Sequence, residues 1–356
     1  MRLIEEVEEV DNVESIENIA PVSPDSSKWQ RFRPSPRKLL PRILIVIFLA
    51  LISTELVCRY AIGLGDPPLY VADSKMEYLL QPSKTYYRFH KRFAVNRYSM
   101  RADDFASTKS DPSEFRVLVI GDSVIYGGVL IDQADIDTEI LKRELQQELK
   151  RPVVVGNASA KSWGPPNELA YLQRFGTLDA DVVILELSSH DYADAPTFVP
   201  VVGVSAPYPD KKPWSALSDL FETYLLPRFF HINDVPPGVD RTLVDGTAYP
   251  QDIVECREAE REFFRFARAH NAKVALMQHL THPEMSGDYQ VGYYANQNVA
   301  KEEGVPYVDD ASELRDSIRR GQDPFNSDDP LHLSTAGQGV LAHVLQAATN
   351  LALNSK

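Results

Sequence analysis

The feature that most constrains the fold is a regular alternation of apolar runs and helical segments after residue 115. Five runs rich in β-branched and aliphatic residues are predicted strands, at 116–120, 152–159, 180–189, 272–280 and 305–310. Four segments with helical periodicity follow or separate them, at 138–150, 166–175, 252–270 and 334–353. Strands that alternate with helices form βαβ units. The sequence therefore predicts an α/β fold in which helices cover both faces of a parallel sheet.

Polar residues stand where the first of these strands ends. The stretch FRVLVIGDSVIYGG (115–128) passes from a buried strand directly into Gly121, Asp122 and Ser123. Ligands of parallel sheets bind beyond the carboxyl ends of the strands. Two interpretations follow: a turn that happens to be polar, or a turn that presents Ser123 for chemistry, with Asp122 as a structural residue that hydrogen-bonds this turn.

Three other polar stretches fall at the same edge of the predicted sheet. They are GNASAKSWGP (156–165), LSSHDY (187–192) and DDPLHLSTAG (328–337). In the last one Asp329 precedes His332 by three residues, so that one turn directs both side chains toward one point. A serine hydroxyl becomes a nucleophile when an imidazole takes its proton and a carboxylate orients that imidazole. Ser123, His332 and Asp329 are the predicted catalytic residues.

These stretches resemble the blocks of the SGNH/GDSL hydrolase family, in the family's order. GDSVIYG (121–127) matches the first block and DPLH (329–332) the last. The resemblance covers residues 115–352. It implies a flavodoxin-like, three-layer α/β/α fold with a parallel five-stranded sheet, Ser123 as nucleophile, and Asp329 and His332 as its partners.

The two middle blocks depart from the family pattern. Aligning the second block from Asn157 puts Ser162 where the family has its oxyanion-hole glycine, with Gly164 as a shifted candidate. In the third block His190 replaces the usual asparagine donor. By this resemblance Ser162, Gly164, His190 and Asn157 are the predicted oxyanion and substrate-binding residues. His190 has an alternative interpretation as a supporting group behind the site.

The N-terminal part of the chain is predicted to lie outside this domain. Residues 1–38 are acidic and then basic, which favours a disordered cytoplasmic tail. Residues 39–65 form a predicted transmembrane anchor, whose membrane contact is made by 43–65. Basic residues cluster before it, so the N-terminus is expected in the cytoplasm. A cleaved signal peptide and a buried helix of the domain are the alternatives.

Two further segments are assigned less fully. Residues 66–114 are a connecting region that either packs on the main domain, 115–356, or forms a stalk. An insertion at about 192–250 is rich in proline and aromatic residues. Loops of this length are usually lids or binding loops. A surface decoration packed by its own aromatic residues is the alternative.

Composition limits the partners and cofactors. The net charge of −14 argues against a nucleic acid partner, because phosphate binding needs clustered Lys and Arg. The two cysteines cannot build a disulfide framework or a cysteine zinc site. His279 and His282 have no carboxylate pattern to complete a metal site, so no metal and no cofactor are expected.

The resemblance implies a serine esterase that acts on ester-linked acyl groups. Bacterial members with an N-terminal anchor are similar to proteins that add or remove acetyl groups on exported polysaccharides. The expected substrate is therefore an acylated carbohydrate or other ester, and the expected location is the bacterial inner membrane, with a periplasmic catalytic domain. An O-acyltransferase, a lipase or thioesterase, and a non-catalytic glycan- or partner-binding protein are the alternatives.

Overall fold

The computed structural model describes residues 36–230 and 248–355 of the 356-residue chain. The predicted tail therefore lies almost wholly outside the described residues, and so does part of the insertion. The chain divides into two units, residues 1–52 and 53–356. Each unit is described by itself.

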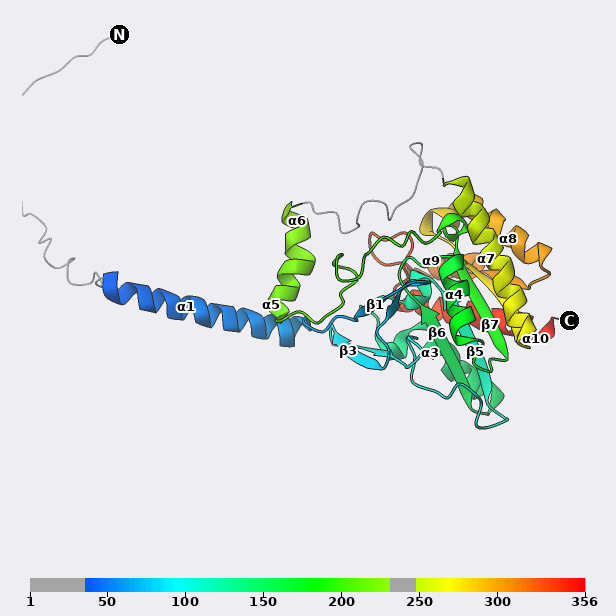
Figure 1. The fold of residues 1–356 in the computed structure, drawn as a ribbon, viewed down its shortest axis with the longest axis horizontal. Helices are drawn as coiled ribbons and strands as arrows, with labels where there is room; N and C mark the ends of the chain where they lie inside the picture. The colour runs from blue at the N-terminus through cyan, green and yellow to red at the C-terminus, as the bar shows by residue number, and fades with distance from the viewer. Residues whose placement is uncertain (1–35, 231–247, 356) are drawn as a thin grey trace, which may run out of the picture. The chain divides into compact units, whose positions relative to one another are not determined.

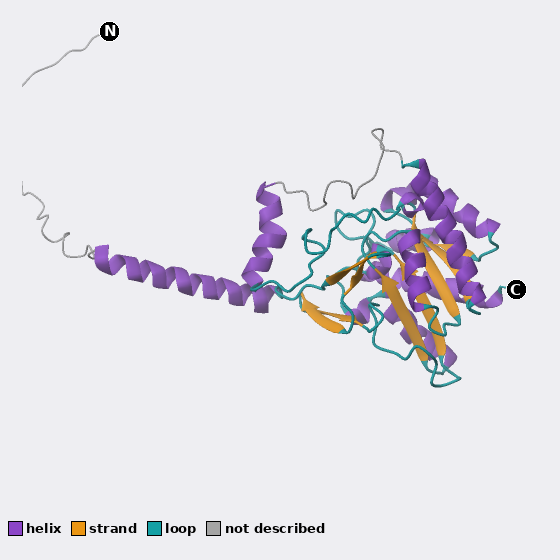
Figure 2. Cartoon of the chain, in the orientation of Figure 1, coloured by secondary structure: helices purple, strands orange, loops and turns teal. Residues whose placement is uncertain are grey.

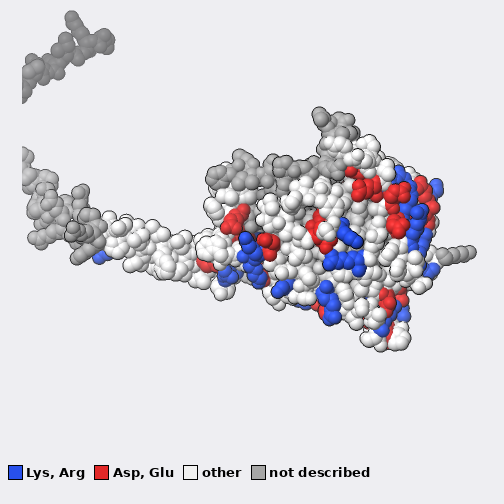
Figure 3. All heavy atoms as spheres, viewed as in Figure 1, with Lys and Arg blue, Asp and Glu red and all other residues white. Residues whose placement is uncertain are grey.

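The apolar N-terminal segment is a helix. α1 (Pro36–Leu56) continues as a π-helical segment, Val57–Ile62. Residues Leu39–Ile62 are long and apolar enough to cross a membrane, and none of the most apolar 18-residue window within them is buried. Its surface is nearly free of charged side chains (Figure 3). The helix ends at Ile62 rather than at residue 65, because Gly63 adopts a left-handed conformation (φ 84°).

The second unit is built on a five-stranded sheet (Figures 1 and 2). Its strands are β5 (Phe115–Gly121), β6 (Val153–Ser159), β7 (Val182–Ser188), β8 (Lys273–His279) and β9 (Tyr307–Asp309). They lie in the order β6-β5-β7-β8-β9, and all neighbours are parallel. This is the 2-1-3-4-5 order of flavodoxin-like folds. The predicted α/β class, parallel sheet and five strands are confirmed.

Helices cover both faces of the sheet because successive strand residues point to opposite sides. Val117 and Val119 pack in one apolar cluster with α3 (Asp137–Leu149) and α10 (Thr335–Asn354). Leu118 and Ile120 pack in a second cluster with α4 (Pro165–Phe175) and α7 (Pro250–Ala269). The sequence analysis assigned no helix between β8 and β9, where α8 (Val291–Glu302) lies.

Shorter elements complete the fold. They are the nucleophile-turn helix α2 (Ser123–Tyr126), the insertion helices α5 (Ala216–Asp219) and α6 (Leu226–Phe230), and α9 (Ala311–Arg319). The exposed side of α7 carries arginines that pair with acidic residues at the end of α8, including Arg261 with Glu302. On the face in Figure 3, basic and acidic side chains are accordingly interspersed.

Residues 66–114 pack on the main domain. They form two antiparallel hairpins, β1 (Tyr70–Asp73) with β2 (Glu77–Leu80), and β3 (Lys84–Arg88) with β4 (Lys91–Val95). Their side chains, among them Met76 and Phe93, belong to the same apolar cluster as Leu118 and Ile120. Of the two interpretations left open by the sequence, the structure favours a packed segment over a stalk.

Arg101 ties this region to the turn that carries Ser123. Its guanidinium is fully buried and donates hydrogen bonds to the backbone carbonyls of Tyr126, Gly128 and Ile131, at 2.6, 2.7 and 2.7 Å. It also stacks over the ring of Phe93, 4.2 Å from the centroid. Burial lowers the pKa of Arg101 to about 10, so the side chain still carries its proton at neutral pH.

Replacing Arg101 by methionine is expected to destabilise the domain by about 3 kcal/mol or more. The buried carbonyls of Tyr126 and Ile131 and the partly buried carbonyl of Gly128 lose their donor, and each buried unsatisfied group costs roughly 1–3 kcal/mol. Thermal unfolding of the full chain in detergent measures the effect. Arg97→Met is the matched control, because Arg97 is exposed and pairs with Asp104 at the surface. Equal stability of the two variants would contradict the prediction.

Candidate active site

Ser123 is the first residue of α2, directly beyond the buried strand β5. Asp122 caps this short helix: its side chain accepts a hydrogen bond from the backbone N–H of Val124 at 2.7 Å. Asp122 is fully buried, whereas Ser123 is partly exposed. The local sequence therefore holds the turn from inside and leaves the serine hydroxyl accessible.

Gly121 allows a second carboxyl group to approach this turn. A Cβ atom at this position would lie 2.5 Å from Glu186 Oε2 and 2.9 Å from a side-chain carbon of Ile125. No larger residue fits between β5 and β7 here. The glycine of the GDS stretch is thus required by packing.

Ser123, His332 and Asp329 form one hydrogen-bonded chain. His332 Nε2 lies 2.9 Å from Ser123 Oγ, and His332 Nδ1 lies 2.8 Å from Asp329 Oδ2. Burial alone would raise the pKa of Asp329, but backbone N–H groups of His332 and Leu331 and the His332 ring lower it. An ionised Asp329 accepts the Nδ1 proton, which leaves Nε2 free to accept the proton of Ser123.

The loop that carries Asp329 and His332 is internally bonded. Asp329 Oδ1 accepts the backbone N–H groups of Leu331 and His332, both at 3.0 Å. Asn326 donates its backbone N–H to the His332 carbonyl at 2.9 Å. Ser334 then caps α10, the closing helix. These bonds fix the orientation of the imidazole before any substrate arrives.

His279 supports this loop, a role that sequence reasoning did not assign. It is fully buried at the end of β8, with Nδ1 2.5 Å from Asp310 Oδ2 and Nε2 2.9 Å from the Leu331 carbonyl. Both ring nitrogens are occupied, and His282 is exposed. Burial alone would lower the pKa of His279, but the charge and hydrogen bond of Asp310 and the Leu331 carbonyl raise it.

A pH-dependent contribution of His279 to stability follows. A folded-state pKa above the unfolded value of about 6.5 stabilises the protein fully below that pH, and the contribution is lost as pH rises through the folded pKa. His279→Gln is therefore expected to be less stable than the wild type at pH 6, with a gap that narrows toward pH 9. Thermal unfolding at both pH values measures this. His343→Gln, at an exposed position, should show no such gap.

The predicted oxyanion residue Ser162 lies on the loop after β6. Because Gly121 and Ser159 are paired in the parallel register, Ser123 and Ser162 follow neighbouring strand ends. Ser162 is exposed and has a left-handed backbone (φ 51°). Within residues 36–230 and 248–355, no acceptor binds the backbone N–H of Ser123 or Ser162. Tyr78 holds this loop by donating its hydroxyl to the Lys161 carbonyl at 2.6 Å.

Two predicted substrate-binding residues are used internally instead. The backbone N–H of Gly164 donates to Asn167 Oδ1 at 3.2 Å, and Gly164 faces the Asp194 carbonyl so closely that a Cβ would lie 2.0 Å from it. Asn157 is fully buried; its amide donates to the Ile125 carbonyl and to Thr138, and accepts from Ser159. The Asn157 side chain and the Gly164 backbone N–H are thus engaged within the fold, and their substrate-binding roles stay predictions.

His190 lies beside the nucleophile turn. Its Nε2 is 3.1 Å from Asp191 Oδ1 and 3.7 Å from Asp122 Oδ2, and its side chain is 41% exposed. One ligand atom from each of Asp122, His190 and Asp191 lies within 4.8 Å of the others, so these residues could together hold a metal ion. The oxyanion role of His190 stays a prediction.

Buried carboxyl groups behind the turn were missed from the sequence. Glu168, Glu186 and Asp191 are fully buried. Burial raises the pKa of each one, and the charges of neighbouring carboxylates, including Asp122, raise it further. Burial and the neighbouring negative charges thus both favour the neutral form of these groups. The one feature of the sequence that could have predicted them is Glu186, because it is an acidic residue inside a strand that is buried on both faces.

The comparisons with known proteins agree with this arrangement. Residues 119–340, more than half of the chain, match the GDSL-like Lipase/Acylhydrolase family. The chain belongs to this family. It is thus an ester-hydrolysing enzyme of the serine esterase type. A search of curated proteins found no significant match to this GDSL-family chain.

Solved structures similar to this GDSL-family chain include several esterases. A two-domain esterase (CEX) active on acetylated mannans has 12% identity and a TM-score of 0.43; the match covers 68% of this chain and 50% of that one. Axe2, an acetylxylan esterase from Geobacillus stearothermophilus, has 14% identity and a TM-score of 0.41, with 66% and 93% covered. TesA has 17% identity and a TM-score of 0.42, with 67% and 99% covered.

Proposed function

We propose that this GDSL-family enzyme is a membrane-anchored esterase that removes acyl groups, chiefly O-acetyl groups, from an extracytoplasmic polysaccharide. The observation that carries the catalytic part is the hydrogen-bonded chain from Ser123 through His332 to Asp329. A non-catalytic binding protein would not need these two hydrogen bonds between the three side chains, so that alternative is set aside.

The geometry supports a two-step mechanism. Ser123 Oγ attacks the ester carbonyl while His332 Nε2 takes the hydroxyl proton, and Asp329 stabilises the imidazolium that forms. The tetrahedral oxyanion accepts hydrogen bonds from the backbone N–H groups of Ser123 and Ser162. When the intermediate collapses, His332 protonates the leaving alcohol. Water, deprotonated by His332, then releases the acid from the acyl-enzyme and restores the serine hydroxyl.

The membrane anchor and its orientation are supported by the apolar helix and the charges around it. The span Leu39–Ile62 follows a group of basic residues: Lys28, Arg31, Arg33, Arg37 and Lys38. By the positive-inside rule this places the N-terminus in the cytoplasm and residues 66–356 outside it. Reporter fusions test the orientation: alkaline phosphatase at the C-terminus should be active, and the same fusion after residue 30 should not.

A polysaccharide substrate is supported by a cavity that reaches the helix of the nucleophile turn. The cavity, of about 710 Å³, is lined by Tyr126 of α2, by Lys161 and by the insertion from Gly203 to Tyr224. A described part of the insertion thus forms a wall, which supports the recognition role over a surface decoration. The aromatic and polar lining is suited to sugar rings, which present both apolar faces and hydroxyl groups.

An acyl-chain series tests the function. The full chain in detergent is given p-nitrophenyl esters from acetate to palmitate, with and without an oligosaccharide acceptor. Turnover that is fastest with acetate and unchanged by acceptor supports the esterase. Acetyl transfer to the acceptor would instead identify an acyltransferase, and a preference for palmitate a lipase. Fluorophosphonate labelling of Ser123 is expected in every catalytic case.

A further inference from the structure

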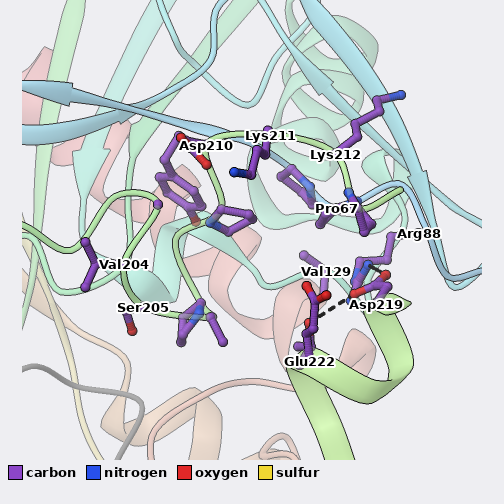
Figure 4. Close-up of a pocket in the computed structure, with 18 of the residues that line it drawn as sticks. Pro67, Arg88, Val129, Val204, Ser205, Asp210, Lys211, Lys212, Asp219 and Glu222 are labelled. Atoms are coloured by element: carbon purple, nitrogen blue, oxygen red, sulfur yellow. Dashed lines mark hydrogen bonds and ion pairs between the residues drawn. The ribbon is translucent and has the colours of Figure 1, made fainter. Parts of the chain in front are cut away.

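The cavity lined by Tyr126 of the nucleophile-turn helix contains a cation that the mechanism does not use. Figure 4 shows the cavity between the hairpin region and the insertion, with Arg88 and Asp219 joined in its wall. That pair is buried, and its closest atoms lie 2.6 Å apart. Lys212 lines the cavity as well and pairs with Asp66 at 2.5 Å. Both of these cations are therefore neutralised by carboxylates.

Lys161 and Lys211 also line the cavity, and neither has such a partner among the described residues; Lys211 is exposed, whereas Lys161 is partly buried. Within the two described stretches of the chain Lys161 forms no ion pair; its Nζ donates to the Pro207 carbonyl at 3.2 Å. The ammonium also lies 5.8–5.9 Å from the ring centroids of Tyr70, Tyr126 and Tyr208. Burial lowers the pKa of Lys161 to about 8, which leaves it mostly protonated at neutral pH.

The aromatic faces stabilise this charge only in part. A lysine ammonium has three N–H donors, and one is used here. Burying a charge without a counter-charge is costly, whereas a hydrogen bond to a charged group is stronger than one between neutral groups. The carboxylates that line the cavity elsewhere, Asp210 and Glu222, are exposed residues and do not pair with Lys161. An anion that enters the cavity would meet an ammonium with free donors.

We propose that Lys161 makes this cavity a recognition site for an anionic group, a carboxylate or a phosphate, carried by the ester substrate. The inference rests on the proposed function and narrows it to acidic glycans or phosphorylated sugars. Lys161 directly precedes Ser162, and Tyr126 lies one helical turn after Ser123. An anionic sugar held at Lys161 would therefore place a neighbouring acyl ester close to the serine hydroxyl.

Binding to the full chain in detergent tests the site without catalysis. Calorimetry with tri-galacturonate, mannose 6-phosphate and xylotriose is done on Ser123→Ala, alone and combined with Lys161→Met. We expect at least one anionic ligand to bind the single variant, and its affinity to fall roughly 10- to 100-fold in the double variant. Binding of tri-galacturonate alone indicates that the anionic group of the substrate is a uronate carboxylate. Binding of mannose 6-phosphate alone indicates that it is a phosphate. Xylotriose binding as tight as that of either anion, or no effect of Lys161→Met, would overturn the proposal.

Kinetics separate this inference from the proposed function. In the wild-type background, the ratio of kcat/KM for acetylated polygalacturonate to that for acetylated xylan should fall about 10-fold or more in Lys161→Met, and recover in part in Lys161→Arg. Lys301→Met, at an exposed position on α8, is the control. If p-nitrophenyl acetate is hydrolysed but the ratio of the two kcat/KM values does not change in Lys161→Met, the proposal for Lys161 is wrong and the esterase function stands. If no ester is hydrolysed but the anionic ligands bind through Lys161, the proposed esterase function is wrong and the anion-binding site stands.

Discussion

Ser123→Ala is expected to lower kcat for p-nitrophenyl acetate by roughly 10⁴- to 10⁶-fold. Ser123 Oγ is the one hydroxyl within hydrogen-bond distance of His332 Nε2 among the described residues. Without it no acyl-enzyme forms, so fluorophosphonate labelling should vanish as well. The measurement is steady-state hydrolysis by the full chain in detergent, with labelling followed by mass spectrometry.

The control for this prediction is Ser286→Ala. Ser286 is exposed and donates to the Pro283 carbonyl and to Asp288, both far from the triad in sequence, so both activity and labelling should persist. Both variants should unfold at the wild-type temperature, since neither hydroxyl is part of the apolar core. Residual serine-dependent turnover in Ser123→Ala would show that another residue is the nucleophile.

Asp329→Asn is expected to lower kcat by roughly 10³- to 10⁴-fold with a small effect on KM. The carboxylate accepts the Nδ1 proton of His332 at 2.8 Å. An amide can present its N–H to Nδ1 instead, which would favour the tautomer whose Nε2 carries a proton and cannot act as base. Steady-state kinetics from pH 6 to 9 measure the loss.

The matched control is Asp328→Asn, one residue earlier in the chain. Asp328 is exposed and has a left-handed backbone (φ 62°), which asparagine also adopts. Its kcat should stay within about twofold of the wild type. Because members of such a triad act as a unit, Ser123→Ala combined with Asp329→Asn should be no slower than Ser123→Ala alone. Additive losses would argue that Asp329 does not act through His332.

Local sequence patterns determined the sheet and the three residues that meet at its edge. The run Val117–Ile120 predicts a strand buried on both faces, and the structure uses its alternate residues in two apolar clusters. The turn after it and the Asp329–His332 spacing are short-range features, fixed by the geometry of a few neighbouring residues. Such features can be identified without knowing what packs against them.

Only the tertiary structure decided which polar groups are free. Asn157 and Gly164 stand in the expected blocks, but Thr138 on α3 accepts a hydrogen bond from Asn157, and the Asp194 carbonyl lies directly against Gly164. In the same way, nothing near Arg101 in sequence predicts that it binds the carbonyls after Ser123. Hydrogen-bond partners distant in sequence are chosen by packing, and no local periodicity records them.

The sequence by itself thus determined the layers, the strand ends and the serine, histidine and aspartate placed there. The tertiary structure decided the support of that site by His279, the buried carboxyls behind it and the unpaired charge of Lys161 in the cavity wall. The physical reason is the separation along the sequence over which each effect acts: backbone propensity and side-chain alternation act over a few residues. Burial and charge pairing depend on every segment that meets at one place.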